Sequence, residues 1–386
     1  MADAPAHIAA EQAEIERYYG NLNTQFRLFG AEELGRRYVV VRLARYACNA
    51  HLDYSDLQRL LAPISSFPSW YPAWRKAALE WEELARQEEA RGRRLSASDH
   101  LLRASMAYHF GQLLARLGTD EKREGRAKRV ELYRRALPFL DRDVQPVQIP
   151  FQGGGLPGYL HLPHGVPRPP CLIMIDGADS VKEEYHNWAG QYARRGLAVV
   201  TFDGPGQGET LGRLTMDPNR YGAAVSAILD FLEQDGRVDA SRAAAWGSSM
   251  GGYLVGVAAA QEPRLKAAVS LGGFYDFRDY GYTWPLGTQI NVQEDLGLST
   301  LAEARQYVRE HLNLGKFAPE IRCPFLVIHG ALDELVTTEE AALMAKAAPR
   351  GEFVVFEDGF HTCTNVNSRL VPLMTGWVLD RLREAA

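Results

Sequence analysis

The most chemically informative segment of this 386-residue chain is the sequence GSSMG at residues 247–251. It follows a short apolar run, Ala243–Trp246, that is typical of a buried strand, and it precedes a helical pattern. A serine on a sharp turn between a strand and a helix is lifted above the sheet edge, where the helix N-terminus stabilises developing negative charge. The context therefore predicts Ser249 as a nucleophile, whereas Ser248 lies beside the apex of the turn.

A base and an acid are needed to activate such a serine, and both follow later in the chain. A serine hydroxyl becomes nucleophilic when a histidine accepts its proton, and an acid holds that histidine in the productive tautomer. In enzymes with this type of serine turn, the acid follows the next-to-last strand and the histidine follows the last. Asp333 comes after the apolar run Phe325–His329, and His361 comes after the run Glu352–Phe356. We therefore predict Asp333 as the orienting acid and His361 as the general base.

Other side chains remain alternatives for these roles. Glu334 and Asp358 are alternatives for the acid, because each lies within a few residues of the predicted acid or base. Cys363 follows the predicted base closely and is an alternative nucleophile. His329, at the end of its strand, is interpreted as a structural histidine.

Two further loops are expected near the nucleophile. A negatively charged intermediate needs amide donors, and one of them is predicted to be the backbone N–H of Met250, the residue after the serine. The other is expected from the loop Ile175–Ser180, which follows the third strand. The sequence DGPGQGE at residues 203–209 lacks the glycine spacing and the lysine of a phosphate-binding loop, so we interpret it as a turn at the pocket rim.

The residues before position 145 have a different pattern from those after it. Glycines are few there and apolar residues recur every three to four positions, which predicts an all-helical domain over residues 1–144. Helices are expected at Ala9–Tyr19, Glu32–Ala47, Ala73–Arg91, Leu101–Leu117 and Glu121–Leu140. Ser98-Asp99 and Thr119-Asp120 are the predicted N-caps of the last two.

Residues 145–386 alternate short apolar strands with helical segments, which indicates a mostly parallel sheet covered on both faces. Strands are expected at Val147–Phe151, Gly158–Leu162, Cys171–Ile175, Ala198–Phe202, Ala243–Trp246, Ala267–Leu271, Phe325–His329 and Glu352–Phe356. Helices are expected at Glu183–Arg195, Asn219–Glu233, Gly251–Ala260, Thr338–Ala347 and Asn367–Arg383. Eight strands that begin with an antiparallel pair match the α/β-hydrolase fold, so we predict this fold for residues 145–386, preceded by the all-helical domain.

Composition and charge argue against several other classes of protein. A net charge of −5 gives no electrostatic reason to expect nucleic acid or an anionic membrane as a partner. No secretory signal is visible in the first twenty residues and no apolar stretch reaches the roughly 18 residues of a membrane span, so a cytoplasmic protein is expected. The four cysteines are scattered without a CxxC pair, and we expect neither a disulfide framework, nor a metal, nor a cofactor. They are Cys48, Cys171, Cys323 and Cys363.

Several motifs together resemble one branch of the α/β-hydrolases. They are the helical N-terminal region, DGADSVKEE at residues 176–184, DGPGQGE at residues 203–209 and the serine turn at residues 247–252. The branch includes 2,6-dihydroxypseudooxynicotine hydrolase, fungal polyketide-shortening hydrolases and FrsA-like proteins. The resemblance implies that the predicted serine, aspartate and histidine form a catalytic triad, that the helical region caps the active site, and that a homodimer is plausible. Many relatives carry His-Gly-X after the third strand, which implies the N–H of Ala178 as the second oxyanion donor.

The resemblance does not define which bond is cleaved. The oxynicotine enzyme hydrolyses a carbon–carbon bond next to a ketone with the help of an additional acidic residue. The segment Gly273–Trp284 is where an equivalent is expected, and it holds Asp276 and Asp279 but no glutamate. These aspartates are interpreted either as pocket residues or as solvated partners of Arg278. Their aromatic neighbours, Tyr280 and Trp284 among them, predict an apolar pocket wall or a packed domain interface.

We therefore expect a serine hydrolase that acts through an acyl-enzyme on a small carbonyl compound. The substrate would be a carboxylic ester or a compound with a carbon–carbon bond adjacent to a ketone. Two alternatives stay open. One is a regulatory or binding protein on a hydrolase scaffold, since fold does not dictate function. The other is a peptidase or acyltransferase that uses the same residues.

Overall fold

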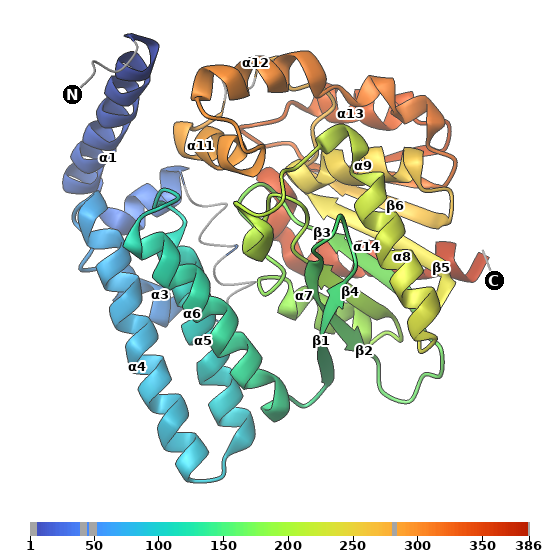
Figure 1. Ribbon diagram of the computed structural model, residues 1–386, viewed down its shortest axis with the longest axis horizontal. Coiled ribbons are helices and arrows are strands. Elements are labelled where there is room, and N and C mark those ends of the chain that lie inside the picture. Colours follow the sequence, from blue (N-terminus) through green and yellow to red (C-terminus); the bar gives the residue numbers. More distant parts are fainter. Residues whose placement is uncertain (1–5, 39–44, 46–51, 280–283, 385–386) are drawn as a thin grey trace. The chain divides into compact units, whose positions relative to one another are not determined.

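The computed structural model describes residues 6–38, 45, 52–279 and 284–384. The chain divides into two compact units, drawn in Figure 1. The first comprises Met1–Leu140, Trp284–Glu294 and Leu298–Gln306, and we call it the helical unit. The second comprises Asp141–Thr283, Asp295–Gly297 and Tyr307–Ala386, and we call it the sheet unit. Two segments from the second half of the sequence therefore belong to the helical unit. The predicted single division after residue 144 placed both segments in the other domain.

The sheet unit contains eight strands in the order β1-β2-β4-β3-β5-β6-β7-β8. Strand β1 pairs antiparallel with β2, β2 pairs antiparallel with β4, and the remaining neighbours pair parallel. The predicted eight-stranded, mostly parallel sheet is thus confirmed. The strands are β1 Asp143–Ile149, β2 Leu156–Leu162, β3 Pro170–Ile175, β4 Ala198–Phe202, β5 Asp239–Ser248, β6 Leu265–Leu271, β7 Phe325–Gly330 and β8 Gly351–Phe356.

Helices cover both faces of this sheet, as its continuously apolar strands require. On one face, α7 (His186–Ala193) and α14 (Asn367–Glu384) contribute residues such as Trp188 and Met374 to a buried cluster with the strands. Helices α8 (Gly222–Asp235) and α9 (Met250–Gln261) lie on the opposite face, in front of the sheet in Figure 1. Helix α13 (Thr338–Ala347) connects β7 to β8. Strands β4 and β7 are buried along their whole length.

The helical unit is built around three consecutive helices, α4 (Trp70–Ala90), α5 (Arg94–Gln112) and α6 (Asp120–Ala136). Trp74 and Phe110 are fully buried between them, with their ring centroids 5.9 Å apart. The predicted N-cap of α6 is confirmed, because the Thr119 side chain accepts a hydrogen bond from the Lys122 N–H. The predicted cap of α5 at Ser98-Asp99 is wrong. This helix begins at Arg94, and the Ser98 hydroxyl donates to the Leu95 carbonyl instead.

The N-terminal helix α1 runs without interruption from Ala6 to Tyr38, so the break expected after Tyr19 is also wrong. Ile15 and Phe26 are both buried, and their spacing of about three helical turns places them on one face. Burial of that face stabilises the helix across Gly20, a residue with low helix propensity. The helix expected at Glu32–Ala47 continues beyond Tyr38 into positions that are, apart from residue 45, outside the described part of the chain, and Cys48 lies outside it as well.

Two helices that the pattern analysis did not identify follow Trp284. They are α11 (Leu286–Asp295) and α12 (Leu301–His311). Leu286, Ile290 and Leu301 form a buried cluster with Ile15 of α1. Helix α3 (Tyr54–Leu61) precedes α4 in the chain. Within the described ranges, no helix is both long enough and apolar enough to cross a membrane.

Candidate active site

The turn that carries Ser249 lies between β5, which ends at Ser248, and α9, which begins at Met250. Ser249 has φ 57° and ψ −121°, a strained conformation for a residue with a side chain. Gly251 permits this close packing, because a Cβ atom there would collide with the carbonyl oxygen of Ile175. The Ser249 N–H donates to Leu271 O of β6 at 2.9 Å, which ties the turn to the neighbouring strand.

The side chains of Ser249, His361 and Asp333 form a continuous hydrogen-bonded chain. His361 Nε2 lies 2.9 Å from Ser249 Oγ, and His361 Nδ1 lies 2.8 Å from Asp333 Oδ2. Asp333 Oδ1 accepts hydrogen bonds from the N–H groups of Leu335 at 2.8 Å and Val336 at 3.1 Å. Burial alone would raise the pKa of Asp333, but the His361 ring and the two N–H groups outweigh it and hold this pKa below its ordinary value. The carboxylate is therefore ionised at neutral pH and accepts the Nδ1 proton of His361.

The backbone around His361 is also unusual. Thr362 and Cys363, directly after the histidine, have φ of 60° and 53°, in the left-handed region that residues with side chains seldom adopt. On the facing side, Gly272 at the end of β6 has φ 59°, and a Cβ atom there would lie 3.0 Å from the Thr362 nitrogen. The strained turn therefore packs closely against the end of β6, and this packing places the histidine over the serine.

The loop after β3 lies against the serine turn. A Cβ atom added to Gly177 would lie 3.1 Å from Ser248 O and 3.6 Å from Ser249 Cβ, so only a glycine backbone fits this approach comfortably. Ala178, the next residue, is buried. Met250, the other predicted amide donor, is the first residue of α9. The structure thus brings both predicted donor segments to the serine.

A buried ionic cluster lies next to this loop. Lys182 Nζ lies 2.6 Å from Asp203 Oδ2, 2.6 Å from Glu209 Oε2 and 2.8 Å from Glu183 Oε1. Asp176 is fully buried beside this cluster, and neither of its carboxylate oxygens has a hydrogen-bond partner among the described residues. Burial and the neighbouring carboxylates, Asp203 foremost, raise the pKa of Asp176 well above its ordinary value despite Lys182. Asp176 therefore retains its proton to a higher pH than an ordinary carboxylic acid does.

Comparisons with known proteins identify the family. The family model described as esterase FrsA-like matches residues 7–276, and the prolyl oligopeptidase family model matches residues 185–380. The chain belongs to the FrsA-like α/β-hydrolases.

Individual relatives of this FrsA-like protein are named as hydrolases. It is 34% identical to 2,6-dihydropseudooxynicotine hydrolase of Paenarthrobacter nicotinovorans over 321 residues, which cover 81% of this chain and 85% of the relative. It is 34% identical to hydrolyase ccsE of Aspergillus clavatus over 268 residues, covering 62% of this chain and only 61% of the fungal protein. The crystal structure of 2,6-dihydroxy-pseudo-oxynicotine hydrolase matches with a TM-score of 0.81 and 31% identity over 88% of this chain and 96% of that one. The FrsA-like protein is therefore a hydrolase.

Of the four residues predicted to line a pocket in the FrsA-like protein, Asp276 and Asp279 belong to the sheet unit. Asp276 pairs with Arg278 through an ion pair and accepts a hydrogen bond from Asn313 Nδ2 at 2.9 Å. Asp279 is exposed, and Tyr280 lies outside the described residues. Trp284 is buried as part of the helical unit. Asp276 is thus engaged by its own neighbours, which agrees with its interpretation as a partner of Arg278.

Two further residues contact the site or the segment next to it: Phe274, one of the aromatic residues predicted to form an apolar pocket wall or a packed interface, and Glu340, which had no predicted role. The Phe274 ring lies 6.0 Å from the His361 ring, measured between centroids. Glu340 of α13 accepts hydrogen bonds from the N–H groups of Tyr275 and Asp276, both at 3.0 Å, and so anchors the segment that follows Phe274. Burial raises the pKa of Glu340 above its ordinary value. No sequence motif indicates this role of Glu340, because its two hydrogen bonds join segments that are far apart in the sequence.

The alternative residues are placed less favourably than the three that form the hydrogen-bonded chain. The Cys363 side chain is fully buried, and burial raises the pKa of its thiol to about 12, so it is not a reactive thiolate at neutral pH. Asp358 pairs with Arg369 on the surface. His329 is fully buried, with Nδ1 3.9 Å from Asp333 Oδ2, and burial lowers its pKa.

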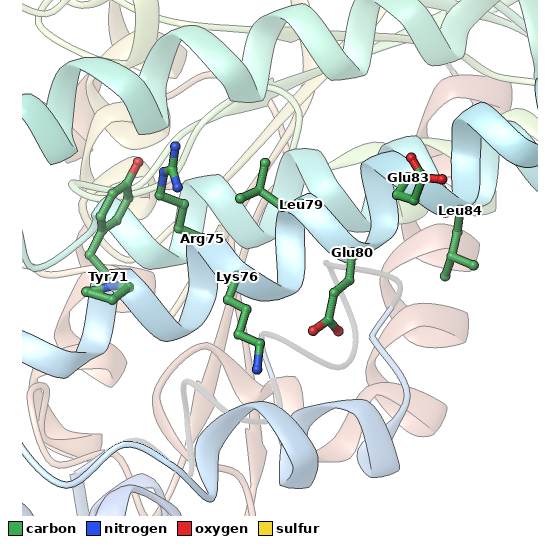
Figure 2. Close-up of a pocket in the computed structure, with 8 residues that line it drawn as sticks. Tyr71, Arg75, Lys76, Leu79, Glu80, Glu83 and Leu84 are labelled. Carbon is green, nitrogen blue, oxygen red and sulfur yellow. The ribbon is translucent and has the colours of Figure 1, made fainter.

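The helical unit has an open groove along α4, with a volume of about 920 Å³. Figure 2 shows the side chains that line it, which include Tyr71, Lys76 and Leu79. Its charged residues Arg75 and Glu80 have partners on neighbouring helices, at 2.9 Å in each case. No residue of the Ser249 site lines this groove. Among the residues that the structure describes, no group of His, Cys, Asp and Glu side chains could hold a metal ion.

Proposed function

We propose that this hydrolase uses Ser249 as a nucleophile and acts through an acyl-enzyme on a small carbonyl compound. The observation that carries the proposal is the hydrogen-bonded chain from Ser249 through His361 to Asp333, with distances of 2.9 and 2.8 Å. These distances are within the range over which a proton can pass directly from the hydroxyl to the ring. The strained turn at Ser249 holds the hydroxyl in place before the substrate arrives.

The reaction would proceed in two halves. Ser249 Oγ attacks the substrate carbonyl while His361 Nε2 accepts its proton, and Asp333 stabilises the imidazolium that forms. The carbonyl oxygen becomes an oxyanion, for which we assign the N–H groups of Met250 and Ala178 as donors. When the intermediate collapses, the bond to the leaving group breaks and His361 returns the proton to that group. A water molecule then repeats the sequence on the acyl-enzyme and releases the acid.

The leaving group distinguishes the two candidate substrate classes. An ester releases an alkoxide, which His361 can protonate directly. A substrate cleaved at a carbon–carbon bond adjacent to a ketone must release its electron pair onto carbon, which requires that carbon to be stabilised as an enol or a similar form. The carbon–carbon class is supported by the similarity to 2,6-dihydropseudooxynicotine hydrolase over most of both chains. The engagement of Asp276 by Arg278 leaves this aspartate a poor acid for such a step, which favours the ester class.

A cap domain over the serine would favour a small substrate over a large one. We propose that the helical unit acts as a cap domain that limits access to the serine. On this proposal peptides and folded proteins are poor substrates, although the prolyl oligopeptidase family model matches residues 185–380.

The decisive experiment compares three proteins in the hydrolysis of p-nitrophenyl butyrate at neutral pH. These are the wild type, Ser249→Ala and the matched control Ser248→Ala. Turnover should disappear in Ser249→Ala and persist in Ser248→Ala, with all three proteins folded by circular dichroism. A folded Ser249→Ala protein with full activity would exclude the proposal.

A fluorophosphonate probe extends this test to the case in which the ester is not a substrate. The probe forms a bond between Ser249 Oγ and phosphorus as fluoride leaves, and intact-mass spectrometry detects the adduct. Labelling without ester hydrolysis would direct the search to β-diketones and related carbon–carbon substrates. A folded wild type that is neither labelled nor active would refute the serine mechanism and favour a binding or regulatory role.

A further inference from the structure

The turn at residues 203–209 contains a buried side chain that contacts the loop Ile175–Ser180 after β3, which we call the oxyanion loop. Gln207 is only 2% exposed. Its Nε2 donates hydrogen bonds to the carbonyl oxygens of Asp176 at 3.0 Å and Gly177 at 2.8 Å. Its Oε1 accepts a hydrogen bond from the Tyr221 hydroxyl at 3.2 Å. Because a carbonyl oxygen only accepts hydrogen bonds, the amide end that faces the loop is Nε2, and Oε1 is left as the acceptor for the Tyr221 hydroxyl.

Peptide geometry transmits this contact to the predicted amide donor. The carbonyl group of Gly177 and the N–H group of Ala178 belong to one planar peptide unit, and none of the described peptide bonds is cis. In a trans peptide unit the C=O and N–H groups point in opposite directions. Holding the Gly177 oxygen on Gln207 therefore fixes the direction of the Ala178 N–H. The second bond, to Asp176 O, fixes the preceding peptide unit in the same way.

The backbone of Gln207 is also held by hydrogen bonds. Its backbone N–H lies 3.0 Å from Gly204 O and 3.1 Å from Thr210 Oγ1, within the same turn. The first residue of the turn, Asp203, accepts hydrogen bonds from both the backbone N–H and the Nζ of Lys182, at 3.0 and 2.6 Å. Lys182 follows Ala178 closely in the chain. The oxyanion loop and the 203–209 turn are thus joined at two points, one of which is the Gln207 amide.

We propose that Gln207 is a positioning residue that preorganises the Ala178 N–H as an oxyanion donor. This inference rests on the proposed serine mechanism. Preorganised donors lower the barrier because they need not reorient as negative charge develops. Without Gln207 the Gly177 peptide unit loses its fixed orientation, whereas the Ser249–His361–Asp333 chain is untouched. The transition state is then bound less tightly, and ground-state binding of the substrate changes little.

The test measures the rate at which a fluorophosphonate labels Ser249 in three variants. Gln207→Leu removes both donated hydrogen bonds. Gln207→Glu keeps the side-chain shape but places an acceptor against two carbonyl oxygens. The control Tyr221→Phe removes only the bond to Oε1 and leaves both loop contacts in place. Values of kcat and KM for p-nitrophenyl butyrate and the melting temperature of each variant complete the set.

We expect the labelling rate and kcat to fall roughly tenfold or more in both Gln207 variants, approaching the ~10²–10³-fold loss that removal of an oxyanion donor produces. KM should stay within about twofold of the wild-type value, and Tyr221→Phe should retain most of the activity. A purely structural role would lower the melting temperature without changing kcat in the folded protein, and this result would overturn the inference. If Gln207→Leu does not fold, the same measurements on the isosteric Gln207→Glu test the inference by the same criteria.

The two proposals fail in different ways. A wild-type protein that the probe does not label would refute the serine mechanism and, with it, the role of Gln207. If the wild type is labelled and folded Gln207→Leu and Gln207→Glu are labelled at the same rate, only the positioning role is refuted.

Discussion

Replacing Asp333 by asparagine tests the role of the acid more sharply than removing the side chain. Asp333 Oδ1 accepts two backbone hydrogen bonds, from Leu335 and Val336, at 2.8 and 3.1 Å. In Asp333→Asn the amide oxygen must remain on these two donors, because rotating the amide would set an NH₂ group against two N–H groups. The NH₂ group therefore replaces Oδ2 and faces His361 Nδ1.

This arrangement imposes the wrong tautomer on the histidine. Nδ1 must now accept a hydrogen bond from the asparagine, so the ring proton moves to Nε2. A protonated Nε2 donates to Ser249 Oγ and cannot accept its proton. Loss of the base through the wrong tautomer lowers kcat by roughly 10⁴-fold in the well-studied serine proteases, equivalent to about 5 kcal/mol. We expect a loss of this order in Asp333→Asn, with the fold retained.

The assay is the turnover of p-nitrophenyl butyrate at neutral pH, together with the rate of fluorophosphonate labelling. Asp358→Asn is the matched control, because Asp358 also lies near His361 in sequence but pairs with Arg369 on the surface. It should keep wild-type activity. Turnover of Asp333→Asn within tenfold of the wild type, or an equal loss in Asp358→Asn, would refute the assignment of the acid.

Three further predictions concern stability and reactivity. The folded protein holds a proton on Asp176 that the unfolded chain releases above its ordinary pKa of 3.8, so wild-type stability should fall as pH rises from that value, at up to about 1.4 kcal/mol per pH unit. Asp176→Asn should abolish this component in urea titrations between pH 4 and 8, and an unchanged pH dependence would show that Asp176 is charged. Gly251→Ala should prevent folding because its Cβ would overlap backbone, whereas Gly376→Ala, with open space in α14, should be neutral or stabilising by roughly 0.5–1 kcal/mol in thermal melts. Cys363→Ala should keep most of the turnover, since a buried thiol with a pKa of about 12 is not a nucleophile, and complete loss in the folded variant would revive that alternative.

The predicted chain of serine, acid and base could be located from the sequence because each residue follows a strand. Ser249, Asp333 and His361 come after β5, β7 and β8, which run parallel in one sheet. The carboxyl ends of parallel strands meet at one edge, so short apolar runs in the sequence are enough to bring these side chains together. Prediction is reliable here because the strands are buried and their composition is distinctive.

Other features depend on contacts that no local pattern records. The PGQGE turn was interpreted as a pocket rim, and nothing in its sequence indicates that Gln207 reaches the loop after β3. The helices α11 and α12 interrupt the alternation of strands and helices on which the fold prediction relied, because their apolar residues pack in the helical unit. The start of α5 was misplaced because Ser98 has the composition of a cap but bonds within the helix.

The discontinuous make-up of the helical unit has a consequence for how the protein is synthesised. Glu11 and Glu14 of α1 contact Leu301 N and Arg305 at 2.8 and 2.7 Å, but these partners are translated long after α1. At 5–20 residues per second, the ribosome needs roughly 8 to 33 seconds to add the intervening 166 residues from Leu140 to Gln306. The face of α1 that carries Ile15 lacks its partners Leu286 and Ile290 during that interval. The helical unit can therefore be completed only after most of the sheet unit has been synthesised, and until then this apolar face of α1 has no access to those partners.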